Sequence, residues 1–232
     1  LKKFKREGPS TRIQALHAMG LAFRKLKNER KALELFGDAV DYFNALKVAE
    51  RPKVNGQALA ALAESHFNLG LGVLAKSKSI KLRGDDKKLA KALKQRSKLL
   101  GETQNIYKRV IAYKRPGWQI AAYTQLGSAY SDLADALENA EVPKKYRVDF
   151  ELEETFRQKM TDRAEKVRAN ALSMYRIATK IAKDKHWFNT YSQQAEAAIA
   201  RLDLNDKSVK EFRMKPSQCG PNRSFSFKEE VR

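Results

Sequence analysis

The chain has 232 residues, of which 42% are hydrophobic, so it can bury a sizeable core and its composition excludes a disordered polypeptide. With only 11 Gly and 6 Pro, and with many Ala, Leu, Lys, Glu and Gln, the composition favours an all-helical protein. The net charge of +20 favours an acidic partner without choosing among nucleic acid, anionic lipid, an acidic protein and an acidic cell-wall polymer.

Residues 1–10 are basic and end in Gly8-Pro9-Ser10, so we expect a linker from a preceding unit, with Ser10 or Thr11 capping the first helix. The sequence starts at Leu1, and this segment has no apolar core of a signal peptide. We therefore expect a processed chain or a fragment, from which any signal peptide would have been lost upstream.

The stretch 11–46 predicts two short amphipathic helices separated by the polar break LKNER. The residues at helical spacing on one face of each are Leu16, Met19, Gly20 and Phe23 in the first and Ala32, Leu35, Phe36 and Ala39 in the second. Small Gly20 and Ala32 suit a close approach of two backbones, and the rings of Phe23 and Phe36 fill the remaining gap. The sequence thus predicts an antiparallel helical hairpin.

This spacing resembles the tetratricopeptide repeat, a hairpin of about 34 residues whose pattern is a large residue, Leu-Gly, an aromatic, Ala, an aromatic and Ala. The matching residues are Leu16, Met19-Gly20, Phe23, Ala32, Phe36 and Ala39. Asn44 stands where the family often has Pro. The resemblance implies a right-handed stack of hairpins, because one hairpin cannot bury its own apolar face.

A second, degenerate unit follows the break at Arg51-Pro52. Residues 56–78 carry an apolar stripe typical of a first helix, and a turn containing Gly84 leads to a long helix that we expect to run from Lys87 to about Tyr113. The stripe of that long helix consists of Leu89, Leu93, Arg96, Leu100, Thr103, Tyr107 and Val110.

A third unit opens at Trp118, after the stop signal Arg115-Pro116-Gly117. Tyr123, Leu126, Gly127 and Tyr130 take the places of Leu16, Met19, Gly20 and Phe23. The stretch 141–160 then predicts an irregular insertion that covers an edge of the stack. The partner pattern of Ala171, Tyr175 and Ala178 returns in a helix expected from about Thr161 to Ala182.

A last helix, expected from about Phe188 to Leu202, closes the array with Tyr191, Ala195, Ala198 and Leu202 on its inner face. After Asn205 the periodicity is lost, and we expect an extended tail. The domain organisation is then a linker over 1–10, a repeat domain over 11–204 and a C-terminal tail over 205–232.

The stretch 118–202 is similar to a set of bacterial envelope repeat proteins that includes components of gliding-motility machinery. The residues that carry this likeness are Trp118, Ala121-Ala122-Tyr123, Leu126-Gly127, Ala140-Glu141-Val142-Pro143, Ala171, Tyr175, Ala178, Trp187 and Asn189. The likeness implies a non-enzymatic assembly factor in the periplasm or cell envelope, with the cytoplasm as the alternative.

The motifs of the sequence predict no catalytic residue, no cofactor and no metal site. His17, His66 and His186 are far apart and lack metal-ligand spacing, and we interpret them as surface or hydrogen-bonded core histidines. No phosphate-binding glycine loop or nucleophile elbow is present. The single Cys219 excludes an internal disulfide and a cysteine-based metal site, and no run of 18 apolar residues predicts a membrane span.

Two candidate surfaces remain. The groove of such a stack is lined by outward residues of the first helices, which by helical phase are Gln14, His17, Arg24, Asn68, Gln125 and Ser128. The basic run between Lys76 and Lys98 places Lys87, Lys91, Lys94 and Lys98 on one outer stripe, where they can contact phosphates or carboxylates. No aromatic residue is interleaved with these lysines, so base stacking has no support.

The function predicted from the sequence is a protein-interaction scaffold that binds an acidic or extended segment of another protein through a basic groove. The alternative is a polyanion binder, for nucleic acid or an acidic envelope polymer, that uses the lysine stripe. An enzyme is the weakest reading, because no acid, base or nucleophile set converges.

Overall fold

The computed structural model describes residues 8–203, and every regular element in this range is helical, which confirms the all-α prediction. The elements are α1 Pro9–Lys25, α2 Glu29–Ala45, α3 Gly56–Ser79, α4 Asp86–Ala112, α5 Pro116–Glu138, α6 Phe150–Asp184 and α7 Thr190–Leu202, with short 3-10 turns η2 Arg51–Lys53 and η3 Lys144–Tyr146. The predicted tail 205–232 and residues 1–7 of the predicted linker lie outside the described residues.

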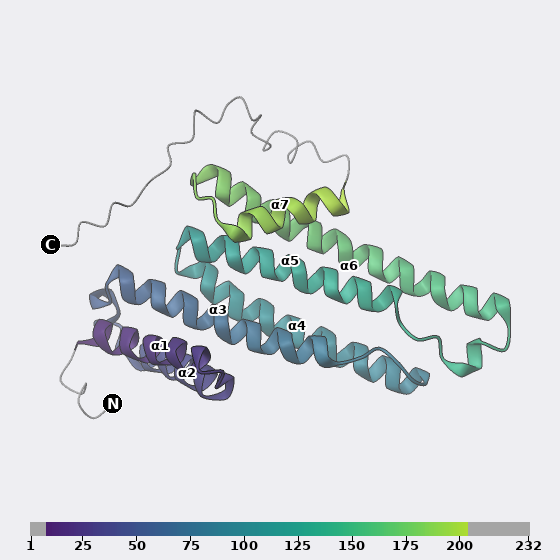
Figure 1. The fold of residues 1–232 in the computed structure, drawn as a ribbon, viewed down its shortest axis with the longest axis horizontal. Helices are drawn as coiled ribbons and strands as arrows, with labels where there is room; N and C mark the ends of the chain where they lie inside the picture. The colour runs from purple at the N-terminus through teal and green to yellow at the C-terminus, as the bar shows by residue number, and fades with distance from the viewer. Residues whose placement is uncertain (1–7, 204–232) are drawn as a thin grey trace.

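The helices pair as the hairpins α1–α2, α3–α4 and α5–α6, which lie side by side in chain order in Figure 1. A glycine on each first helix faces an aromatic ring of its partner helix: Gly20 faces Phe36, Gly70 faces Tyr107 and Gly127 faces Tyr175. A methyl group added at Gly20 or Gly127 would lie 2.6 Å from the nearest ring carbon. The small residue therefore allows each helix pair to pack closely around a buried ring.

The hairpins pack against one another in one repeated way. Each first helix contacts the next first helix, as α1 with α3, α3 with α5 and α5 with α7. Each second helix contacts the first helix that follows it, as α2 with α3, α4 with α5 and α6 with α7. The largest core cluster lies where α3, α4 and α5 meet, and it includes Phe67, Tyr107 and Leu126.

The sequence predicts most helix positions within a few residues, but it is wrong about the start of α6. The helix begins at Phe150 instead of about Thr161. The second half of the predicted irregular insertion 141–160 is therefore helical, and the connection between α5 and α6 is 139–149, which contains the turn η3. Asp149 caps the helix, because its Oδ1 accepts the backbone N–H of Glu151 at 2.7 Å. Phe156 and Met160 are buried at helical spacing, which holds this extra length of helix against the rest of the fold.

The apolar helix α3 is long enough to span a membrane by length and composition alone. More than half of its most apolar window is buried inside the protein, and α3 contacts α1, α2, α4 and α5. In this fold α3 is therefore packed as a core helix.

Candidate partner-binding site

The six residues predicted to bind a partner lie on successive first helices. Gln14, His17 and Arg24 belong to α1, Asn68 to α3, and Gln125 and Ser128 to α5. Because α1, α3 and α5 contact one another in order, the residues follow one side of the fold. They nevertheless form two separate groups with different surroundings.

The first group joins α1 to α3. His17 is only 8% exposed, with Nδ1 3.1 Å from Ser65 Oγ and Nε2 3.2 Å from Glu64 Oε2. Arg24 donates a hydrogen bond to the side-chain oxygen of Asn68, which is 4% exposed. The side chains of His17 and Asn68 therefore reach neighbouring helices and hold two hairpins together.

Gln14 and Arg24 of α1 are more accessible than His17 and Asn68. Gln14 Nε2 donates a long hydrogen bond of 3.4 Å to Asn55 Oδ1 at the surface. Arg24 also pairs with Glu29, with Nη2 2.7 Å from Oε1. Both side chains remain partly exposed, so a partner can reach them at the edge of α1.

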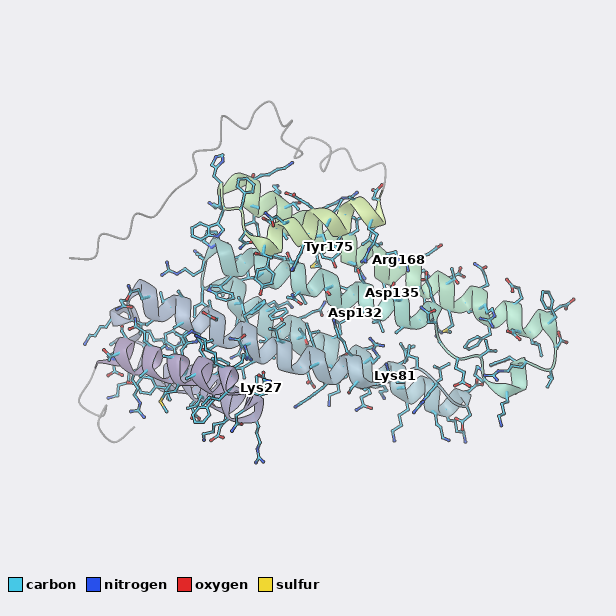
Figure 2. The ribbon with its side chains drawn as sticks, in the orientation of Figure 1. Lys27, Lys81, Asp132, Asp135, Arg168 and Tyr175 are labelled. Carbon is cyan, nitrogen blue, oxygen red and sulfur yellow. The ribbon has the colours of Figure 1, made fainter. Side chains whose placement is uncertain are left out.

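The second group lines an open groove between α5 and α7, with a volume of about 410 Å³. Its lining residues are Thr124, Gln125, Ser128, Tyr175, Gln194, Ala197, Ala198 and Arg201. Figure 2 shows Tyr175 where α5, α6 and α7 come together. This groove contains both predicted α5 residues.

The groove offers hydrogen-bonding groups that the fold itself does not use. Thr124 donates to the backbone oxygen of Tyr191 at 3.2 Å. The side chains of Gln125, Ser128 and Gln194 form no hydrogen bond with the described part of the chain. Amides and a hydroxyl of this kind can pair with the backbone of an extended peptide, and exposed Arg201 adds a cation beside them.

The contribution of α7 to this groove was missed by the sequence reasoning. α7 was expected only to close the array, yet its opposite face presents Gln194, Ala197 and Arg201. The signal was present, because these residues recur at helical spacing on the face opposite Ala195 and Ile199, which are fully buried.

The lysine stripe of α4 is exposed along its whole length, at Lys87, Lys91, Lys94 and Lys98. Lys98 lies 3.9 Å from Glu102. Among the described residues no carboxylate lies within 4.0 Å of the other three ammonium groups. Residues 87 to 98 span about 16 Å of helix, and along it the ammonium groups of Lys87, Lys91 and Lys94 form no ion pair with the described residues.

Arg96 belongs to the same basic run but not to this surface. It is 6% exposed, and its Nη2 donates to the backbone oxygen of Asp132 at 3.3 Å. Burial lowers the pKa of its guanidinium, and the Asp132 carboxylate partly opposes this effect. Arg96 is a core residue that links α4 to α5.

A second basic region lies at the end of the α3–α4 hairpin, where the connection 139–149 docks. The backbone N–H of Glu141 donates to Leu82 at 3.2 Å, and Asp86 pairs with Lys145 and accepts the hydroxyl of Tyr146 at 3.1 Å. The Lys145 ammonium lowers the pKa of the Asp86 carboxyl. The connection therefore does cover an edge of the fold, and it encloses an open pocket of about 720 Å³ between the two turns.

The three histidines have different surroundings: His17 contacts Ser65, the chain neighbour of His66, and His186 lies in another part of the chain. His66 is buried with Nδ1 3.2 Å from the Tyr113 hydroxyl, and burial with nearby Arg109 lowers its pKa to about 4. His186 is exposed in the turn before α7. Within residues 8–203 no group of three or more His, Cys, Asp or Glu side chains is arranged to hold a metal ion.

Comparison of the chain with protein-family models, with curated proteins and with solved structures finds no match.

Proposed function

We propose that the protein is a non-enzymatic interaction scaffold, built as a right-handed solenoid of tetratricopeptide-like hairpins, that binds an acidic or extended segment of another protein. Three observations support this fold. A glycine faces an aromatic ring in every hairpin, successive first helices contact one another, and each second helix contacts the first helix that follows. Stacks of this kind present the side chains of their first helices to partners.

The observation that carries the proposed activity is the α5–α7 groove. Its amide and hydroxyl groups at Gln125, Ser128 and Gln194 have no partner within the described chain. A few convergent polar groups in a groove fix the orientation of a bound segment. The guanidinium of Arg201 and the high net positive charge favour an acidic segment and accelerate its association.

The test is affinity capture from lysate of the source cell with matched variants, at low and moderate salt and after nuclease treatment. The groove variant combines Gln194→Ala with Arg201→Glu, and the control combines Gln193→Ala with Lys180→Glu at exposed positions outside the groove. We expect discrete proteins on the wild type and the control and their loss from the groove variant. Equal capture by the groove variant would remove this groove as the binding site.

We also propose that the scaffold works in a periplasmic or envelope complex, with the cytoplasm as the alternative. This proposal rests on the likeness of residues 118–202 to envelope repeat proteins. Fractionation of the native protein into cytoplasmic, periplasmic and membrane pools tests it, and recovery in the cytoplasmic pool alone would contradict it.

The second candidate function is polyanion binding through the lysine stripe of α4. The observation that favours it is that, among the described residues, no carboxylate lies within 4.0 Å of the ammonium groups of Lys87, Lys91 and Lys94. Binding of duplex DNA or polyphosphate should then weaken steeply with salt. Reversal of the three lysines to Glu should abolish binding, whereas reversal of exposed Lys159, Lys166 and Lys180 on α6 should preserve most of it. Equal loss in both variants would show that only net charge matters.

A further inference from the structure

The outer face of α1 carries an apolar stripe that residues 8–203 leave largely uncovered. Its members are Ala15, Ala18, Met19, Ala22 and Leu26, of which Leu26 is 74% exposed and Met19 is 36% exposed. Met19 was expected on the packed face of its hairpin, so its exposure corrects that prediction. In Figure 1 the α1–α2 hairpin lies at the opposite end of the array from α7.

Four of these five places are apolar in α5 as well, in the same register, and the fifth, that of Ala18, is Gln125. With Gly20 aligned on Gly127, the two helices share Pro, Ile, Ala, Gly, Ala and Leu at equivalent places, and Leu126 replaces Met19. The equivalent pairs are Pro9 and Pro116, Ile13 and Ile120, Ala15 and Ala122, Gly20 and Gly127, Ala22 and Ala129, and Leu26 and Leu133.

In α5 these places pack against the preceding α3–α4 hairpin. Leu126 is 5% exposed, Ala129 is 6% exposed and Leu133 is 7% exposed. Ala129 and Leu133 line one small cavity with Leu74 of α3 and with Arg96 and Leu100 of α4. The preceding hairpin, including its second helix α4, thus covers the α5 counterparts of Ala22 and Leu26, and the counterpart of Met19 is buried in the same core cluster.

α3 receives the preceding helix at two of these places. Gly72, the α3 counterpart of Ala22, approaches Leu33 of the preceding α2, because a methyl group added there would lie 3.1 Å from Leu33 Cδ1. Leu69, the counterpart of Met19, packs in the cluster that includes Val40 of α2. The counterpart of Leu26 is the exposed Lys76, so α5 is the closer model for α1. Both later hairpins therefore use the places of Met19 and Ala22 to receive the preceding hairpin, and α1 leaves them open among the described hairpins.

We propose that the α1 stripe is a docking surface for an amphipathic helix of the α4 kind, the second helix of another helical hairpin, seated with large apolar side chains over Ala15, Met19, Ala22 and Leu26. Continuity with the α2–α3 and α4–α5 interfaces fixes both the occupant and its register. The small alanines admit the close approach of a helix backbone. This surface is separate from the α5–α7 groove.

The experiment supplies such a helix in the required connection. A chain is made in which residues 56–115, the α3–α4 hairpin and its exit turn, are joined directly to Pro9 and followed by residues 10–232. Because Pro9 and Pro116 are equivalent, the new junction reproduces the native turn between α4 and α5. Leu26→Cys, in a Cys219→Ser background, reports accessibility through the rate at which maleimide labels the thiol at position 26.

The expected result is at least a tenfold slower labelling of the thiol at position 26 in the extended chain than in the original one, since the counterpart Leu133 is buried. The control is Glu34→Cys on α2, whose counterpart Ser173 on α6 stays exposed. Labelling at position 34 should not change. Addition of Ala22→Glu to the extended chain should restore fast labelling at position 26.

Two outcomes would overturn the proposal. Equal labelling rates at position 26 in both chains would mean that the stripe does not accept an α4-type helix. Protection of that position in the original chain that increases with protein concentration, and is lost with Met19→Glu, would assign the stripe to a second copy of the protein instead.

Discussion

Acidification should unfold this protein partly through one buried histidine. His66 lies in the interior of α3 with its Nδ1 3.2 Å from the Tyr113 hydroxyl, and it is 4% exposed. Desolvation is the largest effect that lowers its pKa from 6.5 to about 4, followed by the positive charge of Arg109. The backbone of Leu62 and the carboxylate of Asp41 oppose that shift. In the folded state His66 is therefore neutral at physiological pH.

The direction in which pH changes the free energy of unfolding follows from proton binding. The unfolded chain protonates this histidine below pH 6.5, whereas the folded protein resists protonation until about pH 4. The contribution of neutral His66 to the free energy of unfolding is thus complete above pH 6.5 and is lost as the pH falls toward 4. At about 1.4 kcal/mol for each pKa unit, the full loss is about 3 kcal/mol, of which about 2 kcal/mol is gone at pH 5.

The assay is urea unfolding followed by circular dichroism at pH 7.5 and pH 5, for the wild type and for His66→Leu. Leucine suits the site because Leu16 holds the equivalent place in the first hairpin. The wild type should lose about 2 kcal/mol more than His66→Leu between the two pH values. The control His186→Asn, at an exposed turn position with positive φ, should behave like the wild type. An equal pH dependence of wild type and His66→Leu would refute the reasoning.

Three further substitutions test the packing. Gly127→Ala places a methyl group 2.6 Å from the Tyr175 ring and should destabilise the protein by about 1–3 kcal/mol in thermal unfolding. In the same assay the control Gly101→Ala, whose added methyl group meets nothing within 4 Å, should be neutral or stabilising. Leu133→Ala should lower the free energy of unfolding by about 2–5 kcal/mol, and Leu26→Ala at the equivalent exposed place should change it by about 0.5 kcal/mol or less. Tyr107→Phe removes a buried hydroxyl that has no hydrogen-bond partner among the described residues, so chemical denaturation should show an unchanged or higher stability; a loss above about 1 kcal/mol would contradict that account.

Helix positions were predictable here because their signals are local. The apolar stripe of α3 and the Arg115-Pro116-Gly117 break are visible in the sequence, and the structure begins α3 at Gly56 and α5 at Pro116. The pairing of Gly127 with Tyr175 also follows from the sequence pattern, although the two residues are separated by the long connection 139–149. Small residues opposite aromatic rings carry enough steric information to survive such an interruption.

The start of α6 was not predictable from breakers and charge. The acidic residues Glu151 and Glu153 read as a solvated, irregular segment, yet carboxylates in a first turn stabilise a helix that Asp149 caps. Recognition of the helix required knowing that Phe156 packs against Tyr146 of the connection, with ring centroids 5.4 Å apart. That contact depends on tertiary structure, which helical phase alone does not supply.

The candidate site shows the same limit at the level of single side chains. Helical phase correctly assigned Gln14, Asn68 and Gln125 to first helices, but it could not tell which outward positions a neighbouring hairpin would cover. Asn68 is buried because Arg24 of the adjacent α1 reaches it, whereas Gln125 stays free because α7 stands far enough from α5 to leave a groove. Which polar groups keep their hydrogen-bonding capacity therefore depends on how neighbouring helices pack, and among the described residues those of Gln125, Ser128 and Gln194 keep it beside α7.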